Sequence, residues 1–182
     1  LHNRRYFHKA LKLELERSRR HDRKFTLIMV DVDDFKNYND SLGHPAGDSL
    51  LKELSARLTE LNRLTTVVAR YGGEEFVLLV PEADPVAAGI VAERIRSGVE
   101  SYEFAHGEVQ PEGRLTLSIG VACYPKDGED AGTLIDHADQ ALYQAKNGGR
   151  NRFVLWSEMK APISDPLDDH GDALADADAH RA

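Results

Sequence analysis

The hydrophobic positions of the chain follow different periods in different stretches, and each period predicts one kind of element. Phe7, Leu11 and Leu15 recur every four residues, which predicts a helix with one apolar stripe that runs to about Arg20. Residues 25–32 form a short, nearly unbroken apolar run, which favours a strand buried on both faces in the middle of a sheet. After a polar stretch, a second helix is indicated by apolar residues on one side: Leu50, Leu51, Leu54, Leu58 and Leu61.

The second half of the chain continues this alternation of strands and helices. Residues 66–80 contain two β-rich runs joined by Gly72 and Gly73, and glycine tolerates the positive φ of tight turns, so the stretch predicts a hairpin. Asp84 can cap a following helix, and residues 115–123 predict another strand. A last helix and a short closing strand are predicted by the following positions: Leu134, Ile135, Ala138, Ala141, Leu142 and Ala145, stopped by Gly148 and Gly149, then 153–156. The pattern indicates an α/β fold with a mixed sheet.

Composition places the chain among ordinary globular domains. Its 182 residues suit one domain, with 41% hydrophobic and 30% charged residues. No apolar run approaches the roughly 20 residues that span a bilayer, and no signal-peptide pattern opens the chain. Cys123 lies in an apolar run, where a buried and unreactive thiol is expected. We therefore expect a cytoplasmic domain, whose parent protein could still be anchored in a membrane.

The net charge of −8 is concentrated at the C-terminal end. Residues 157–182 hold seven acids against Lys160 and Arg181, a net of −5, which leaves −3 for residues 1–156. A balance of this kind argues against broad nucleic-acid binding, which needs a basic face. We expect residues 1–156 to form the domain and the acidic segment after them to be disordered.

Two separate groups of acids are candidates for chemistry. Asp31, Asp33 and Asp34 follow the predicted central strand, where open α/β sheets gather ligands. An EF-hand loop starting at Asp31 would need an oxygen ligand, Gly and Glu where this chain has Phe35, Lys36 and Leu42, so that interpretation fails. Helix capping and a magnesium site at the strand end remain open.

The second acidic group lies at the predicted hairpin tip. Glu74 and Glu75 are adjacent and repel each other, which favours a bound cation there, although acidic turn residues that serve solubility remain an alternative. If the hairpin pairs beside the central strand, Asp31 and Glu74 converge on one point. Alternation along the strand would put Asp31 and Asp33 on one face and turn Val32 inward.

Three further sets of residues are compatible with a nucleotide. The backbone amides of Asp34, Phe35 and Lys36 open a predicted short helix and could cradle a phosphate, with the charge of Lys36 beside them. Lys146 and Arg150 could contact phosphate or could equally complement the end of the last helix. The third set consists of Asn39 and Asp48, which on the residues alone are expected to cap helices.

Gly72-Gly73-Glu74-Glu75-Phe76 resembles the signature of the GGDEF-domain diguanylate cyclases, in the variant with Glu at the third position. The likeness covers roughly residues 1–156. Other motifs follow the family pattern in the same order: Asn3-Arg4-Arg5, Asp31-Val32-Asp33-Asp34-Phe35-Lys36, Asn39-Asp40, Gly43-His44, Gly47-Asp48, Ser118-Ile119-Gly120-Val121, Ala138-Asp139-Gln140-Ala141-Leu142-Tyr143 and Lys146 to Asn151.

The resemblance implies a role for each candidate residue. Asp31, the carbonyl of Val32 and Glu74 would hold Mg²⁺ (or Mn²⁺), and Glu75 would assist the metal or remove a proton. Lys36 would steady the α-phosphate. The family places the remaining substrate contacts on these residues: Asp34 and Phe35 by their amides, Gly72 and Gly73 in the hairpin, Lys146 and Arg150 on the outer phosphates, and Asn39, Asp48 and His44 at guanine.

The resemblance also implies a fold, a reaction and partners. The fold is a palm-like α/β domain with a mixed central five-stranded sheet flanked by helices, in which the hairpin carries the signature. Two GTP molecules would condense to cyclic di-GMP, with loss of two pyrophosphates, between the two domains of a homodimer. Because the chain starts inside the family's opening motif, we expect an upstream sensory or dimerising region in the parent protein.

One motif departs from the family pattern, and two other functions remain open. Many members carry an inhibitory product site, Arg-x-x-Asp, where this chain has Arg63-Leu64-Thr65-Thr66. Since a Thr66 hydroxyl cannot accept paired hydrogen bonds from guanine as a carboxylate does, we expect weak or absent feedback inhibition. The alternatives are a catalytically silent module that binds GTP or cyclic di-GMP and a palm-like enzyme acting on another nucleotide.

Overall fold

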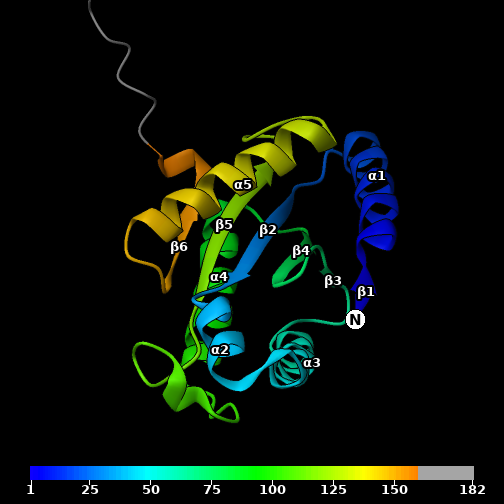
Figure 1. The fold of residues 1–182 in the computed structure, drawn as a ribbon. Helices are drawn as coiled ribbons and strands as arrows, with labels where there is room; N and C mark the ends of the chain where they lie inside the picture. The colour runs from blue at the N-terminus through cyan, green and yellow to red at the C-terminus, as the bar shows by residue number, and fades with distance from the viewer. Residues whose placement is uncertain (160–182) are drawn as a thin grey trace, which may run out of the picture.

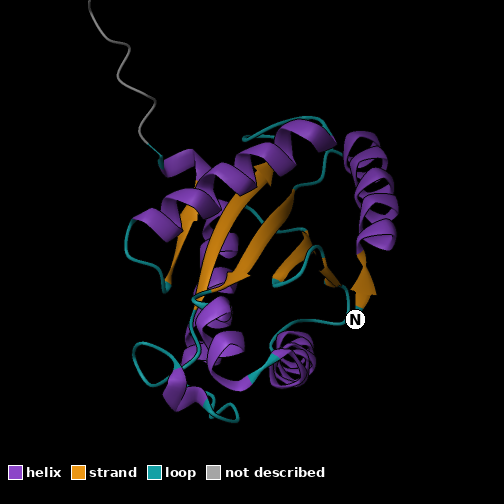
Figure 2. Ribbon diagram, in the orientation of Figure 1, coloured by secondary structure: helices purple, strands orange, loops and turns teal. Residues whose placement is uncertain are grey.

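The computed structural model describes residues 1–159 and contains one mixed sheet with helices on both faces (Figures 1 and 2). The strands in chain order are β1 (His2–Asn3), β2 (Phe25–Val32), β3 (Val67–Arg70), β4 (Glu75–Pro81), β5 (Leu117–Tyr124) and β6 (Arg152–Leu155). The helices are α1 (Arg4–His21), α2 (Phe35–Leu42), α3 (His44–Glu60), α4 (Pro85–Glu100) and α5 (Ala131–Asn147), with short 3₁₀ turns η1 (Gly107–Val109) and η2 (Trp156–Glu158).

The predicted mixed α/β sheet is confirmed, but the strand number of five is wrong. The sheet has six strands in the order β1-β3-β4-β2-β5-β6. The additional strand, β1, is two residues long and pairs in parallel with β3. His2 and Asn3 are polar and exposed, so no hydrophobic pattern could indicate this strand. β2, which the sequence placed in the middle of the sheet, lies between β4 and β5.

Side-chain alternation along β2 divides the core into two layers. Leu27 and Met29 pack with α1 and α5 on one face of the sheet. Ile28 and Val30 pack with α2, α3 and α4 on the other face. In Figure 1, α5 crosses over the central strands while α2 and α3 lie below them. Since every side chain of β2 is buried, the carboxylate of Asp31 at its end is held by a rigid element.

Local sequence signals explain most element boundaries. The Asp84 side chain accepts a hydrogen bond from the Ala87 amide at 3.0 Å, which confirms the predicted cap of α4. α5 ends at Asn147 before Gly148, as predicted. The hairpin is also where the sequence placed it, but the reason given for its glycines is wrong. Neither Gly72 nor Gly73 has a positive φ.

The remaining expectations of the sequence concern the cysteine, the membrane and the tail. Cys123 is buried, and burial raises the pKa of its thiol to about 11, so the thiol stays protonated. None of the helices within residues 1–159 has both the length and the apolarity to cross a bilayer. The first residues of the expected disordered segment belong to η2. Residues 160–182 lie outside the described part of the chain, so the expectation for them stays a prediction.

Candidate functional site

The end of β2 and the start of β4 bring the two acidic groups together. In the antiparallel register Asp31 is the direct partner of Glu75, and Glu74 precedes it in the turn. The side chain of Asp31 is almost fully buried. Burial raises the pKa of Asp31 to about 6; Lys146 lowers it, and the charges of Glu74 and Glu75 raise it further. The sequence predicted that Asp31 and Glu74 converge on one point; the register adds that Glu75, the next residue, is the cross-strand partner of Asp31.

Lys146 supplies the positive charge that these acids need. Its ammonium Nζ lies 2.8 Å from Asp31 Oδ2. Within residues 1–159 no set of three or more His, Cys, Asp and Glu side chains is arranged to hold a metal ion. The carboxylates of Asp31, Glu74 and Glu75 are nevertheless hard oxygen ligands, and a cation already contacts one of them. This donor set fits Mg²⁺ or Mn²⁺.

Asp33 has a different environment from Asp31. Its carboxylate is 4% exposed and accepts hydrogen bonds from Ser118 Oγ at 2.6 Å and from Thr116 Oγ1 at 2.8 Å. The backbone amide of Asn151 donates a third, at 3.0 Å. Asp33 therefore lies beside β5, as Asp31 does, but the oxygens of Asp33 already accept hydrogen bonds from protein donors. Val32 points into the opposite core layer, as the alternation predicted.

The turn after β2 positions the first amides of α2. Asp34 adopts a left-handed conformation with φ of 52° and precedes the helix without a side-chain cap. The amides of Asn37 and Tyr38 donate to the Asp34 carbonyl, whereas the first amides of any helix have no intrahelical acceptor. The side chain of Lys36 is exposed beside them. Arg150 Nε lies 3.7 Å from Asp34 Oδ2, and both residues line a hollow of about 170 Å³.

α2 and α3 form the third part of the candidate site. Asn39 and Asp48 lie inside these helices, so the helix-capping interpretation of both residues is wrong. Asn39 Oδ1 is buried and has no hydrogen-bond partner within the described residues 1–159. A Cβ atom at Gly47 would lie only 1.9 Å from that oxygen. Asp48 and His44 are exposed on α3, which leaves their polar groups accessible to a ligand.

The hairpin turn is held by an arginine that the sequence analysis missed. Arg70 NH2 donates to the Gly73 carbonyl at 2.6 Å, and its Nε lies 3.3 Å from the Gly72 carbonyl. A Cβ atom at Gly72 would approach Glu75 Oε2 to 2.3 Å. The Glu75 carboxylate therefore lies close to Gly72, and the turn presents both glutamates from a backbone braced by Arg70.

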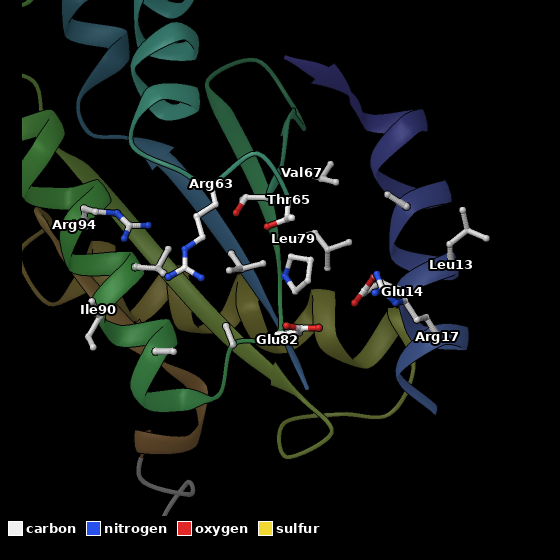
Figure 3. A pocket seen from close by; sticks show the side chains of 17 residues that line it. Leu13, Glu14, Arg17, Arg63, Thr65, Val67, Leu79, Glu82, Ile90 and Arg94 are labelled. Atoms are coloured by element: carbon white, nitrogen blue, oxygen red, sulfur yellow. The ribbon is translucent and has the colours of Figure 1, made fainter. Parts of the chain in front are cut away.

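A separate cavity of about 630 Å³ lies between α1, β4 and α4. Arg63 and Thr66 of the expected inhibitory motif line it, and Figure 3 shows Arg63 extending into it from the loop before β3. Arg17 of α1 and Arg94 of α4 also line it. Their place in this cavity could not be predicted from the sequence, because both arginines are distant from Arg63 along the chain. This cavity is at the end of β4 opposite Glu75, so it is not part of the acidic site.

The chain is similar in sequence to known proteins. The family model "Diguanylate cyclase, GGDEF domain" matches residues 1–152. Diguanylate cyclase A of Treponema denticola is 42% identical over 130 residues, which are 71% of this chain and 34% of that protein. The chain spans 38% of the length of one curated relative from Bacillus subtilis and 14% of that of the probable diguanylate cyclase DgcE of Escherichia coli.

Solved structures show the same fold. The GGDEF domain of YfiN from Pseudomonas aeruginosa superposes with a TM-score of 0.78 at 32% identity, covering 85% of this chain and 96% of that one. The active GGEEF domain of a diguanylate cyclase from Vibrio cholerae gives a TM-score of 0.77 at 29% identity, covering 86% and 97%. With a matching family model over most of its length and these neighbours in structure, the chain belongs to the GGDEF-domain family of diguanylate cyclases.

Proposed function

We propose that this domain condenses two GTP molecules into cyclic di-GMP, with release of two pyrophosphates, between two facing copies. The observation that carries the proposal is the pairing of Asp31 with Glu75 at the strand ends, where the Lys146 ammonium contacts the buried Asp31 carboxylate. A triphosphate brought to this point would meet the amides of α2 and the cations of the α5 end. Membership of the family and the likeness to an active GGEEF domain support the same reaction.

Asp31, the Val32 carbonyl and Glu74 would hold Mg²⁺ or Mn²⁺, which offsets the charge that develops on the phosphoryl oxygens. Glu75 would assist at the same site or accept the proton of the attacking 3′-hydroxyl. The amides of Asp34 and Phe35, with the Lys36 amide and ammonium, would bind phosphate oxygens. All of these groups lie at the ends of β2 and β4 or at the start of α2.

Lys146 and Arg150 would bind the outer phosphates of GTP. In the structure they pair with Asp31 and Asp34 instead. Both cations are at least a third exposed, so exchanging a carboxylate for a phosphate requires only side-chain rotation. Lys146 would leave Asp31 free to ligate the divalent ion, which keeps the local charge balanced. Gly72 and Gly73 would let the nucleotide approach the hairpin closely.

Guanine would be recognised between α2 and α3. Its N1–H and N2 amino group are donors that suit the Asp48 carboxylate, and an asparagine can both donate and accept. The Asn39 Oδ1 atom is buried and has no hydrogen-bond partner among residues 1–159, so it is an unsatisfied acceptor that such a base would engage once the amide turns toward it. His44 is exposed at the start of α3, beside this position.

The proposal extends to regulation and cellular location. We expect weak or absent feedback by cyclic di-GMP through Arg63 and Thr66, because Thr66 lacks a carboxylate. The domain would work in the cytoplasm, attached to an upstream sensory or dimerising region of a longer protein. The competing function is a silent module that binds GTP or cyclic di-GMP and regulates a partner. The presence of both hairpin glycines and both glutamates favours the enzyme.

Incubation of the full chain with GTP and Mg²⁺ tests the proposal. We expect pyrophosphate and cyclic di-GMP in a two-to-one ratio, and no cyclic dinucleotide from ATP. Glu75→Gln should lower the rate by about 100-fold or more, as expected for loss of a group that moves a proton or supports the metal. Glu82→Gln is the matched control, since Glu82 is exposed beyond the opposite end of β4. GTP binding without product would support the silent module, and equal use of ATP would support another palm enzyme.

A further inference from the structure

The three acids that follow one another at the end of β2 each contact one residue near the end of α5. Asp31 pairs with Lys146, and Asp34 pairs with Arg150. Asp33, between them, accepts the backbone amide of Asn151. The first two contacts involve cations that the proposed nucleotide would draw away. The third is a part-buried contact to a neutral donor, which a bound phosphate does not replace.

Three protein donors hold the Asp33 carboxylate. Its Oδ1 accepts from Ser118 Oγ, and its Oδ2 accepts from Thr116 Oγ1 and the Asn151 amide. Its own amide donates to the Thr116 carbonyl at 3.0 Å. A buried carboxylate with three donors and no cation pair among residues 1–159 makes a directional anchor. Protein donors thus occupy three of the roughly four acceptor positions of this carboxylate.

The segment that Asp33 holds has an unusual backbone. Arg150 and Asn151 are consecutive residues with φ of 61° and 46°, in the left-handed region that non-glycine residues rarely adopt. Such a conformation persists only where its surroundings hold it. Asp33 binds the amide of Asn151, while the Asn151 side chain contacts Arg96 and Glu100 of α4. These contacts fix the direction in which the neighbouring Arg150 side chain leaves the loop.

We propose that Asp33 is a positioning residue for nucleotide binding and not a metal ligand. It holds residues 148–151 against the end of β2, so that Arg150 and Lys146 stay within reach of the triphosphate after they release their own carboxylates. The inference rests on the proposed function for its nucleotide. The structural half of the claim, that Asp33 holds this loop, can be measured without any ligand.

The test compares variants of the full chain. Asp33→Asn keeps an acceptor oxygen for the Asn151 amide but loses the negative charge, and Asp33→Ala removes both. Asp127→Asn is the matched control, because Asp127 is also a buried carboxylate that accepts a backbone amide, from Cys123 at 2.7 Å, at the opposite end of β5. Binding is measured with Mg²⁺ and a GTP analogue whose α,β-bridging oxygen is replaced by methylene. Hydrogen exchange is measured at the amides of residues 148–151.

We expect Asp33→Asn to weaken analogue binding about tenfold, the size of losing one charge-assisted hydrogen bond. Asp33→Ala should weaken it further, so that asparagine is a partial rescue. The Mg²⁺ concentration for half-maximal binding should stay within about twofold of wild type. Exchange at 148–151 should be faster in both variants, and Asp127→Asn should change neither readout. If Asp33→Ala does not fold, Asp33→Asn and the control carry the comparison.

Three results would overturn the proposal. Analogue binding by Asp33→Asn within about twofold of wild type would remove its positioning role. A large shift in the Mg²⁺ requirement, like that of Asp31→Asn, would make Asp33 a metal ligand. Unchanged amide exchange at residues 148–151 would show that Asp33 does not hold the loop. If wild type itself binds no analogue, the proposed function fails, and the exchange result alone still decides whether Asp33 anchors this segment.

Discussion

The carboxyl of Asp31 is costly to ionise in the folded protein. Burial raises its pKa to about 6 from an ordinary value of 3.8, even with Lys146 beside it. A carboxyl group whose pKa is higher in the folded protein than in the unfolded chain makes its full contribution to stability below the unfolded pKa, where it is protonated in both states. This stability is lost as the pH rises through the folded pKa, because the unfolded chain releases its proton first. The window for Asp31 therefore lies between about pH 4 and pH 6.

This sign leads to a prediction for Asp31→Asn, which cannot ionise. Relative to wild type, the variant should gain roughly 2 kcal/mol in free energy of unfolding between about pH 4.5 and pH 8, since each pKa unit is worth about 1.4 kcal/mol. Urea unfolding at a series of pH values measures the difference, while turnover is measured on the same samples. A constant difference across this range would show that Asp31 titrates normally and is not under electrostatic strain.

Gly47 offers a second prediction at the scale of one residue. Alanine would normally stabilise a helix by about 1 kcal/mol over glycine. At Gly47, however, the added methyl would meet Asn39 Oδ1 at 1.9 Å and displace the amide. We expect Gly47→Ala to lower GTP affinity at least about tenfold if Asn39 contacts guanine.

Gly89→Ala on α4 is the control, because its nearest side-chain atoms would be 3.8 Å and 3.9 Å away. It should stabilise the protein and leave GTP binding unchanged. Isothermal calorimetry with the GTP analogue compares the two variants. Equal affinities would place guanine away from Asn39.

Among the elements, periodicity could predict the helices and the central strands because their buried faces repeat. Leu50, Leu54 and Leu58, for example, are all buried on α3 as the spacing indicated. β1 could not be predicted, since its two exposed polar residues carry no pattern. Contacts that depend on register were also beyond reach. The prediction that Asp31 and Glu74 converge, for example, did not specify that Glu75 is the residue paired with Asp31 across the strands.

The candidate site shows the same limit. The family motifs identified most of its residues, and α/β topology explained why acids at the ends of neighbouring strands lie close together. Alternation along the strand could not distinguish Asp33 from Asp31, because both are aspartates on one face of the same strand end; the resemblance assigned the metal to Asp31 but gave Asp33 no role. Only the packing of β5 and the 148–151 loop shows that Asp33 is surrounded by donors while Asp31 faces a lysine.

The contact between α5 and β5 depends on one glycine, which provides a prediction at the element scale. A Cβ atom at Gly120 would lie 2.0 Å from the Ala138 carbonyl and 2.2 Å from the Leu142 amide, both in the backbone of α5. Backbone atoms cannot rotate away, so Gly120→Ala must push α5 off the sheet. We expect a loss of roughly 2–3 kcal/mol in free energy of unfolding, typical of overpacking a core.

Because α5 carries Lys146, the displacement should also move that ammonium away from Asp31 and weaken GTP binding. Gly73→Ala is a suitable comparison for the stability measurement, since a Cβ atom there would have no neighbour within 4 Å. Chemical denaturation of both variants decides the point. A Gly120→Ala protein as stable as wild type would mean that the helix and strand can separate at little cost.

At the scale of the whole molecule, the described residues provide one acidic site on one pair of strands. Cyclic di-GMP contains two phosphodiester bonds, each formed by the 3′-hydroxyl of one GTP and the α-phosphate of the other. Under the proposed function, one copy of the domain would therefore position only one of the two reacting triphosphates. Closing the ring would then require a second copy that presents its own GTP in the opposite direction.

The rate per protein molecule should consequently rise in proportion to protein concentration while most copies are monomeric, and level off when they are paired. Mixing provides a sharper measurement at constant wild-type concentration. Added Glu75→Gln should form hybrids with one working site, which can join one bond but not close the ring, so cyclic product falls and linear dinucleotide accumulates. Glu82→Gln, added in the same amount, should raise the yield instead. A specific rate independent of concentration and of added Glu75→Gln would mean that a single copy completes both bonds.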